Sequence, residues 1–366
     1  MMMIAVTRRT LITFVKPANR LALPRILTLV FLAALLIPFA AMGKPCDSCK
    51  VVSDSASSRA EMRIYHVKPG VDFQYEQPPK SRYYTFPVKD FGGYFRTTFT
   101  KENIPYIGAM IIGTAFLVDR DQAITDYAKH LGDLWGLKHT NKQKPVIKWS
   151  LKLGGKPVDT PLNFPQDLES GMYFLGDGIV HSSIAVGLWG YGKIARDDRA
   201  IQTGTQCMEA ILCTGAAIQV LKHSFGRESE QVATAPGGRW RLFPSPAKYQ
   251  RHVPNYDAMP SGHIATAMAT VTVIADNYPD KVWIRPVGYT LMSVLMYAML
   301  NNGVHWASDY PLGISVGYTL AKVIDARSRT VFVDPKAQHH AGLIKSTDLT
   351  PYVADNGGGL AMNFHF

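Results

Sequence analysis

The chain has 366 residues, of which 47% are hydrophobic and 18% charged, and its formal net charge is +11 at neutral pH. This balance fits a globular protein with one large core or two smaller ones. Five of the positive charges lie before residue 44, which leaves a mild +6 for the rest. The excess favours anionic substrates or an anionic membrane surface without requiring either, and no basic block with interleaved aromatic residues indicates a nucleic-acid partner.

Residues 1–43 resemble a targeting segment rather than part of a fold. A basic stretch without acidic residues precedes an apolar run from Ile26 to Ala41, and small residues follow at Ala41-Met42-Gly43. This order predicts a cleaved secretory signal peptide, and the run is short for a retained membrane anchor, which is the alternative. We therefore expect a periplasmic or envelope-associated protein that begins near Lys44.

Residues 44–90 are rich in Ser, Pro, Lys and Tyr without a helical period, which predicts an extended linker. Residues 91–137 are helical in pattern, and 138–170 form a predicted loop whose lysines make a solvated face. Beyond it, helical segments alternate with short loops, except for the long Gly- and Pro-rich stretch 224–259. The predicted helices cover 171–193, 197–223, 261–277, 282–301 and 305–326.

These elements predict an all-α helical bundle over 91–330, whose apolar runs are mostly shorter than a membrane span. The tail 331–366 differs. Turn residues Asp355-Asn356-Gly357-Gly358 precede an alternation in which Leu360, Met362, Phe364 and Phe366 share one side. That pattern predicts a terminal strand in a small β-hairpin.

The four cysteines fit an oxidising compartment, but their pairing cannot be deduced from spacing. They are Cys46, Cys49, Cys207 and Cys213. No second Cys or His pair accompanies Cys46 and Cys49 at zinc spacing, and no acidic cluster resembles a metal site, so we expect neither a metal nor a cofactor.

Two short stretches carry the chemistry. Pro260-Ser261-Gly262-His263 is typical of a helix start that can hold an anion, because free N–H groups point outward there and Gly lets a ligand approach. His305 and Asp309 are four residues apart, which places them on one face if the segment is helical. A carboxylate there can orient a histidine and stabilise its charged form. Together they suggest phosphoryl transfer through histidine.

The order of motifs resembles the type 2 phosphatidic acid phosphatase and vanadium haloperoxidase superfamily, over roughly 171–326 and upstream to about 91. The second family motif is intact at 260–263. The first begins at Lys222 but has Ser229 and Glu230 where Arg-Pro is expected. The third keeps His305 and Asp309 but has Ala298 and Met299 in place of Ser-Arg.

The resemblance implies a helical bundle of the acid phosphatase and haloperoxidase type, and a role for each matching residue. His305 attacks phosphorus, Asp309 holds its other ring nitrogen, and His263 protonates the leaving oxygen and then activates water. Ser261 and the backbone N–H of Gly262, together with Lys222 and Arg227, bind the phosphate. The implied substrate is a small-molecule or lipid phosphate, with peripheral membrane contact; the oligomeric state is not predicted.

The two missing arginines leave alternatives open. Arg227, Arg239 and Arg241 are candidates to replace them, and Asn301 and Asn302 could donate neutral hydrogen bonds. A catalytically degraded binding or structural domain of the envelope is the alternative from another class. A vanadium haloperoxidase is disfavoured, because vanadate would need the same arginines. Asp177 and Glu209 are expected as buried partners of cations, and His181, His223 and His252 as surface or structural residues.

Overall fold

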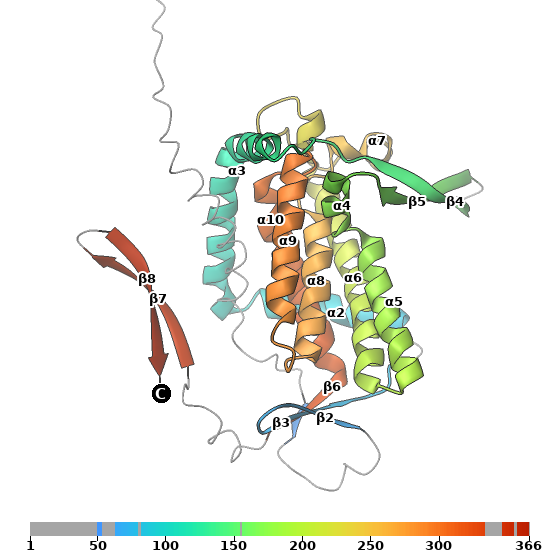
Figure 1. The fold of residues 1–366 in the computed structure, drawn as a ribbon, viewed down its shortest axis with the longest axis vertical. Coiled ribbons are helices and arrows are strands. Elements are labelled where there is room, and N and C mark those ends of the chain that lie inside the picture. The colour runs from blue at the N-terminus through green and yellow to red at the C-terminus, as the bar shows by residue number, and fades with distance from the viewer. Residues whose placement is uncertain are drawn as a thin grey trace, which may run out of the picture.

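The computed structural model describes residues 50–52, 63–79, 82–153, 156–333, 346–354 and 357–365. The predicted signal peptide, Cys46, Cys49 and Phe366 lie outside these ranges. Figure 1 shows a helical bundle with a small sheet at one end and a β-hairpin projecting at the other. The predicted bundle is therefore confirmed.

Long helices form the body of the molecule. Helix α6 begins after the N-cap Asp197, whose side chain accepts from the N–H of Ala200, and ends at the left-handed Gly226. The α-helices of the described residues, α6 included, have the following bounds: α2 Arg82–Thr98, α3 Ile104–Leu134, α4 Leu168–Phe174, α5 Gly178–Ala195, α6 Asp198–Phe225, α7 Pro246–Arg251, α8 Gly262–Asn277, α9 Ile284–Asn301 and α10 Tyr310–Asp325.

The predicted segment 171–193 is two helices, α4 and α5, because Asp177 caps the second by accepting from the N–H of Ile179. Asp177 is thus a helix cap rather than the partner of a cation. Glu209 meets the expectation, since the buried guanidinium of Arg82 pairs with it. Within the described residues Cys207 and Cys213 are both buried free thiols on α6.

Helices α8 and α10 pack against each other closely enough that two glycines on α10 have no room for a side chain. A Cβ on Gly317 would lie 2.1 Å from the carbonyl oxygen of Ala265, and one on Gly313 would lie 2.7 Å from that of Ser261. Both obstructing atoms belong to the backbone and cannot rotate away. This close contact fixes the start of α8, where the anion-binding motif was predicted.

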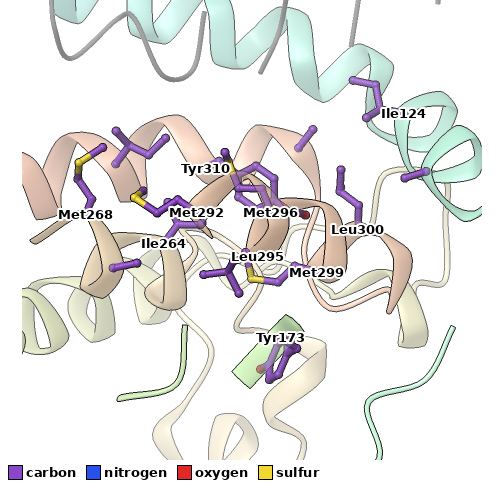
Figure 2. Packing of buried hydrophobic residues seen from close by; sticks show 14 of the residues in the cluster. Ile124, Tyr173, Ile264, Met268, Met292, Leu295, Met296, Met299, Leu300 and Tyr310 are labelled. Carbon is purple, nitrogen blue, oxygen red and sulfur yellow. The ribbon is translucent and has the colours of Figure 1, made fainter. Parts of the chain in front are cut away.

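The core beside this contact is rich in methionine. Figure 2 shows Met268 of α8 with Met292, Met296 and Met299 of α9, packed around Ile264 and near Tyr310. All of these side chains are buried. Unbranched, polarizable Met side chains adapt to irregular gaps between helices, which suits a core where three helices converge on a polar site.

The segments that flank the bundle pair with each other in a four-stranded sheet of order β1-β6-β3-β2. Its strands are β1 Lys50–Val52, β2 Ile64–Lys68, β3 Val71–Tyr75 and β6 Arg329–Val333. Strands β2 and β3 form a hairpin, β6 is antiparallel to β3, and β1 is parallel to β6. The expected linker 44–90 thus contains three strands and the start of α2, and the expected boundary at 330 falls inside β6.

Two further hairpins complete the structure. The prediction of a loop at 138–170 is wrong. The strands β4 Gln143–Leu153 and β5 Lys156–Pro165 pair antiparallel there, although both contain prolines. Near the C-terminus β7 Ser346–Ala354 pairs antiparallel with β8 Gly357–His365, which confirms the predicted terminal hairpin. Among the described residues, no helix combines the length and apolarity needed to cross a membrane.

Candidate active site

His305 lies just after α9, almost fully buried, and its orientation is fixed by a backbone carbonyl. The ring Nδ1 lies 2.7 Å from the oxygen of Ala258. Because a carbonyl can only accept, Nδ1 must carry a proton, so in the neutral form of the imidazole the free lone pair lies on Nε2. This tautomer is the one that a nucleophilic histidine needs.

Asp309 lies beside His305 Nδ1, but it is not the nearest partner of that nitrogen. The segment from His305 to Asp309 is an extended turn that leads into a 3-10 helix, so the two side chains do not share the face of an α-helix. The nearest approach of Nδ1 to Asp309 Oδ2 is 3.4 Å, longer than its bond to the Ala258 carbonyl. Instead, Oδ2 accepts from the N–H of Trp306 at 2.7 Å, so Asp309 fixes the loop behind the histidine.

Arg227 lies behind Asp309 and donates all of its hydrogen bonds within the protein. Its Nη1 binds Asp309 at 2.7 Å and Ser308 Oγ at 2.6 Å, and its Nη2 binds Asp121 at 2.6 Å. The carbonyl of Gly237 accepts from Nε and Nη2. With its five N–H groups engaged and its side chain fully buried, Arg227 has no donor left for a phosphate. Its predicted role in phosphate binding would require the exchange of one of these partners, and it stays a prediction.

Asp121 of α3 is the polar residue that sequence reasoning missed. Besides Arg227 it accepts from the N–H and the hydroxyl of Ser308, at 3.0 and 2.5 Å. Burial raises its pKa, an effect that Asp309 increases and Arg227 opposes. For Asp309, the charge of Arg227 and the nearby His305 outweigh burial, so its pKa is lowered and the carboxylate stays ionised. A lone Asp in an amphipathic helix offers no sequence signal for this role.

His263, in the first turn of α8, faces the second histidine. The centroids of the two rings are 6.2 Å apart, at an interplanar angle of 70°. Tyr173 of α4 packs on the other side of His263, with centroids 4.5 Å apart. Burial, followed by the charges of His305 and Lys222, lowers the pKa of His263 well below its usual value. The imidazole is therefore neutral in the free protein at neutral pH.

Lys222 also reaches this place from the last turn of α6. Its Cε lies 3.9 Å from the position that a Cβ on Gly262 would occupy, which puts the lysine beside the start of α8. Its ammonium lies 3.3 Å from Oδ2 of Asp257. The N–H groups in the first turn of α8 receive no capping side chain from Ser261, so they remain suited to an anion.

Ser261 is buried, and its hydroxyl is 3.7 Å from the sulfur of Met299. Its backbone N–H donates to the carbonyl of Asp309 at 3.0 Å. This geometry does not present Ser261 as a free donor. Met299 and Ser229, which stand where the family has arginines, are both buried, and neither brings a positive charge to the site.

Three of the expected substitutes for those arginines make other contacts. Arg241 pairs with Glu228 at 2.5 Å, and Arg239 is an exposed residue. Asn301 donates to the carbonyl of Lys138, and Asn302 donates to that of Glu169. Lys222 is a cation that the structure places beside the start of α8, where a phosphate would bind.

The structure brings together His305, His263, Lys222 and the backbone at Gly262, and places Asp309 and Arg227 behind them. This arrangement offers an imidazole nucleophile, a second imidazole for proton transfer, and an ammonium beside a helix N-terminus. No group of three or more potential metal-ligating side chains is found in the described part of the chain.

Comparisons with known proteins give one family match and one similar solved structure. The model of the PAP2 superfamily matches residues 204–329, and no curated protein matches the chain. Among solved structures, the crystal structure of Aquifex aeolicus LpxE is similar, with 18% sequence identity, a TM-score of 0.32, and coverage of 43% of this chain and 82% of that chain. The residues that match the PAP2 superfamily model include Lys222, both histidines and Asp309.

Proposed function

We propose that this protein is a phosphoric ester hydrolase that works through a phosphohistidine. The observation that carries the proposal is the bond from His305 Nδ1 to the Ala258 carbonyl, because in the neutral imidazole it places the lone pair on Nε2, with the ring of His263 nearby. An imidazole held in that tautomer can attack phosphorus without first losing a proton.

The reaction proceeds in two displacements. Nε2 of His305 attacks phosphorus, the P–N bond forms as the P–O bond to the alcohol breaks, and protonated His263 gives its proton to the leaving oxygen. Water then attacks phosphorus and passes a proton to His263, and the P–N bond breaks to release phosphate. Bound phosphate raises the pKa of His263 again, since its negative charge offsets the burial that lowers it in the free protein.

The weak point of this chemistry is the small number of cations. Removing one donor to a developing oxyanion commonly costs about 10²–10³ in rate. Met299 and Ser229 stand where the family has arginines, so they favour a slow enzyme. They also favour the alternative function, a binding domain that keeps the fold without turnover. The two alternatives differ in whether a covalent phosphoenzyme forms.

The test is hydrolysis of p-nitrophenyl phosphate by the wild-type protein and by His305→Ala, from acidic to neutral pH. His252→Ala, at an exposed position, is the matched control. We expect turnover and an acid-labile phosphoenzyme in the wild type and in His252→Ala, and neither in His305→Ala. A wild-type protein that binds phosphate but forms no phosphoenzyme would replace this proposal with the binding domain.

We further propose an envelope location and a substrate at a lipid surface. Large apolar side chains are exposed along the first half of α3 and the end of α2, including Phe95, Phe99, Ile111, Ile112 and Phe116. Exposed apolar area of this kind is typical of an interaction surface. Co-sedimentation with anionic vesicles would support peripheral membrane contact, whereas recovery of all protein in the supernatant would contradict it.

A further inference from the structure

The long segment between α6 and α8 carries an excess of positive charge on its surface. Residues 231–256 contain four Lys or Arg side chains and no acidic one. The guanidinium of Arg241 is matched by the buried carboxylate of Glu228. The three others are exposed and enter no ion pair among the described residues; they are Arg239, Lys248 and Arg251. This surface is complementary to an anionic partner.

Large apolar side chains project from the same segment. Trp240 is 38% exposed, Leu242 is 62% exposed and Phe243 is 76% exposed. These three residues and the three unpaired cations all lie within residues 239–251, which we call the basic tip. Exposed apolar and cationic side chains together are typical of a segment that enters the headgroup region of an anionic membrane.

The backbone of the basic tip is anchored to the end of α6. The N–H of Arg241 donates to the carbonyl of Gly226 at 2.9 Å, and the N–H of Phe243 donates to that of Ser224 at 3.1 Å. Phe243 has a φ of 52°, in the left-handed region that is unfavourable for a residue with a large side chain. This strained backbone holds the ring in solvent, where the ring gains little packing. Strain of this kind clusters at binding sites, so the exposed ring indicates a binding surface.

The basic tip lies at the same end of the molecule as the candidate site. Ser224, one of its two anchors, follows Lys222 by two residues. A Cβ on Gly238, directly before the tip, would lie 3.0 Å from Nε1 of Trp306, the neighbour of His305. Figure 1 shows α7, which forms part of the tip, at the end of the bundle opposite the sheet. A membrane that receives the tip would therefore face this end of the bundle.

We propose that the basic tip docks on an anionic lipid surface. Leu242 and Phe243 enter the headgroup layer, and the three unpaired cations bind lipid phosphates. Docking turns the end of the bundle that holds His305 toward the lipid. This inference rests on the membrane contact proposed above and adds the orientation of the molecule, which the exposed residues along α3 do not define.

The test is co-sedimentation of the chain from Lys44 onward with vesicles of phosphatidylcholine and phosphatidylglycerol in equal parts. Omitting the predicted signal peptide removes an apolar run that would itself bind lipid. We expect Leu242→Ser/Phe243→Ser to weaken binding roughly tenfold or more, because the burial of one large apolar side chain is worth that factor. The matched control is Ile194→Ser/Val282→Ser, whose wild-type side chains are 88% and 82% exposed in the last turn of α5 and just before α9. It should bind as the wild type does.

A second variant tests the charges without changing the apolar residues. Arg239→Gln/Lys248→Gln/Arg251→Gln should weaken binding to the mixed vesicles on the order of a hundredfold, because each cation near an anionic surface contributes about a fivefold factor. Wild-type binding should also weaken as salt is added. Equal affinity of the wild type for these vesicles and for vesicles of phosphatidylcholine alone would overturn the anionic surface.

Unchanged binding of Leu242→Ser/Phe243→Ser would overturn the docking of the tip, and so would an equal loss in the matched control. Loss of binding in Ile111→Ser/Ile112→Ser alone would leave the membrane contact to α3 and would also overturn the tip. A wild-type protein that stays in the supernatant would overturn both the tip and the membrane contact. Hydrolysis of p-nitrophenyl phosphate by the same preparations reports on the proposed hydrolase separately, because that substrate is soluble and needs no membrane.

Discussion

Arg227 is the residue on which the geometry of the site depends most, although it touches no reacting atom. It joins Asp121 of α3, Ser308 and Asp309 in one buried network. Through Asp309 it fixes the loop that carries His305. Removing one partner of a buried ion pair leaves an uncompensated charge, which commonly costs about 3–5 kcal/mol.

We therefore expect Arg227→Lys to lower the free energy of unfolding by about 3–5 kcal/mol, because one ammonium cannot serve both carboxylates and the Gly237 carbonyl. Denaturant titration measures this change. Arg241→Lys is the control: its guanidinium is 36% exposed, so its pair with Glu228 should contribute less than about 1 kcal/mol. Unchanged stability of Arg227→Lys with a raised KM would instead return Arg227 to phosphate binding.

The burial of His181 predicts a dependence of stability on pH. Neither of its buried ring nitrogens has a hydrogen-bond partner among the described residues. Burial lowers its pKa from 6.5 to about 4. The unfolded chain then binds the proton more tightly than the folded protein. The contribution of the neutral imidazole to the free energy of unfolding is fully present above pH 6.5. It is lost progressively as the pH falls toward 4.

We expect His181→Leu to unfold at a lower pH than the wild type, with the difference in unfolding free energy growing by about 1.4 kcal/mol per pH unit between pH 6.5 and 4. Acid titration followed by circular dichroism measures it. The exposed His252→Leu should leave the acid transition unchanged. Parallel stability curves for wild type and His181→Leu would contradict the burial of a neutral imidazole.

At the scale of elements, the long helices were predictable because their apolar residues recur at helical spacing and their ends carry capping residues. The two candidate histidines could be found because they lie near helix termini in short motifs. The contacts of Asp309 with Trp306 and Arg227 could not be found in this way. Four-residue spacing assumes an α-helix, and the chain at 305–309 instead makes a turn whose direction is set by Asp121 and Arg227, far away in sequence.

The close contact of α8 and α10 gives a prediction at this scale. Gly317→Ala would force a Cβ against the Ala265 carbonyl, so we expect a loss of stability of about 1–3 kcal/mol and a displaced start of α8. Gly215→Ala, in α6 with nothing within 4 Å of the new Cβ, should instead stabilise by about 0.5–1 kcal/mol. Thermal unfolding compares the two, and equal effects would mean that the helices can separate without cost.

For the whole molecule, the sheet of flanking segments was not predictable from local pattern, because β3 pairs with a strand more than 250 residues later in the chain. Its contacts with the bundle are specific. Tyr75 of β3 is buried and its hydroxyl donates to the carbonyl of Asn277 at the end of α8. Arg82, at the start of the helix α2 that follows the sheet, pairs with Glu209 of α6. The sheet thus closes the end of the bundle opposite the candidate site (Figure 1).

A protein cut to the expected helical domain, 91–330, should therefore fold poorly, whereas one comprising 50–333 should keep a cooperative transition. The shorter protein loses Arg82 and leaves the carboxylate of Glu209 buried without its closest partner, a change worth about 3–5 kcal/mol. It also exposes apolar area that Tyr75 covers. Calorimetry of both proteins decides the matter: if 91–330 unfolds as cooperatively and at the same temperature, the sheet is an appendage, and the bundle alone holds the histidines in place.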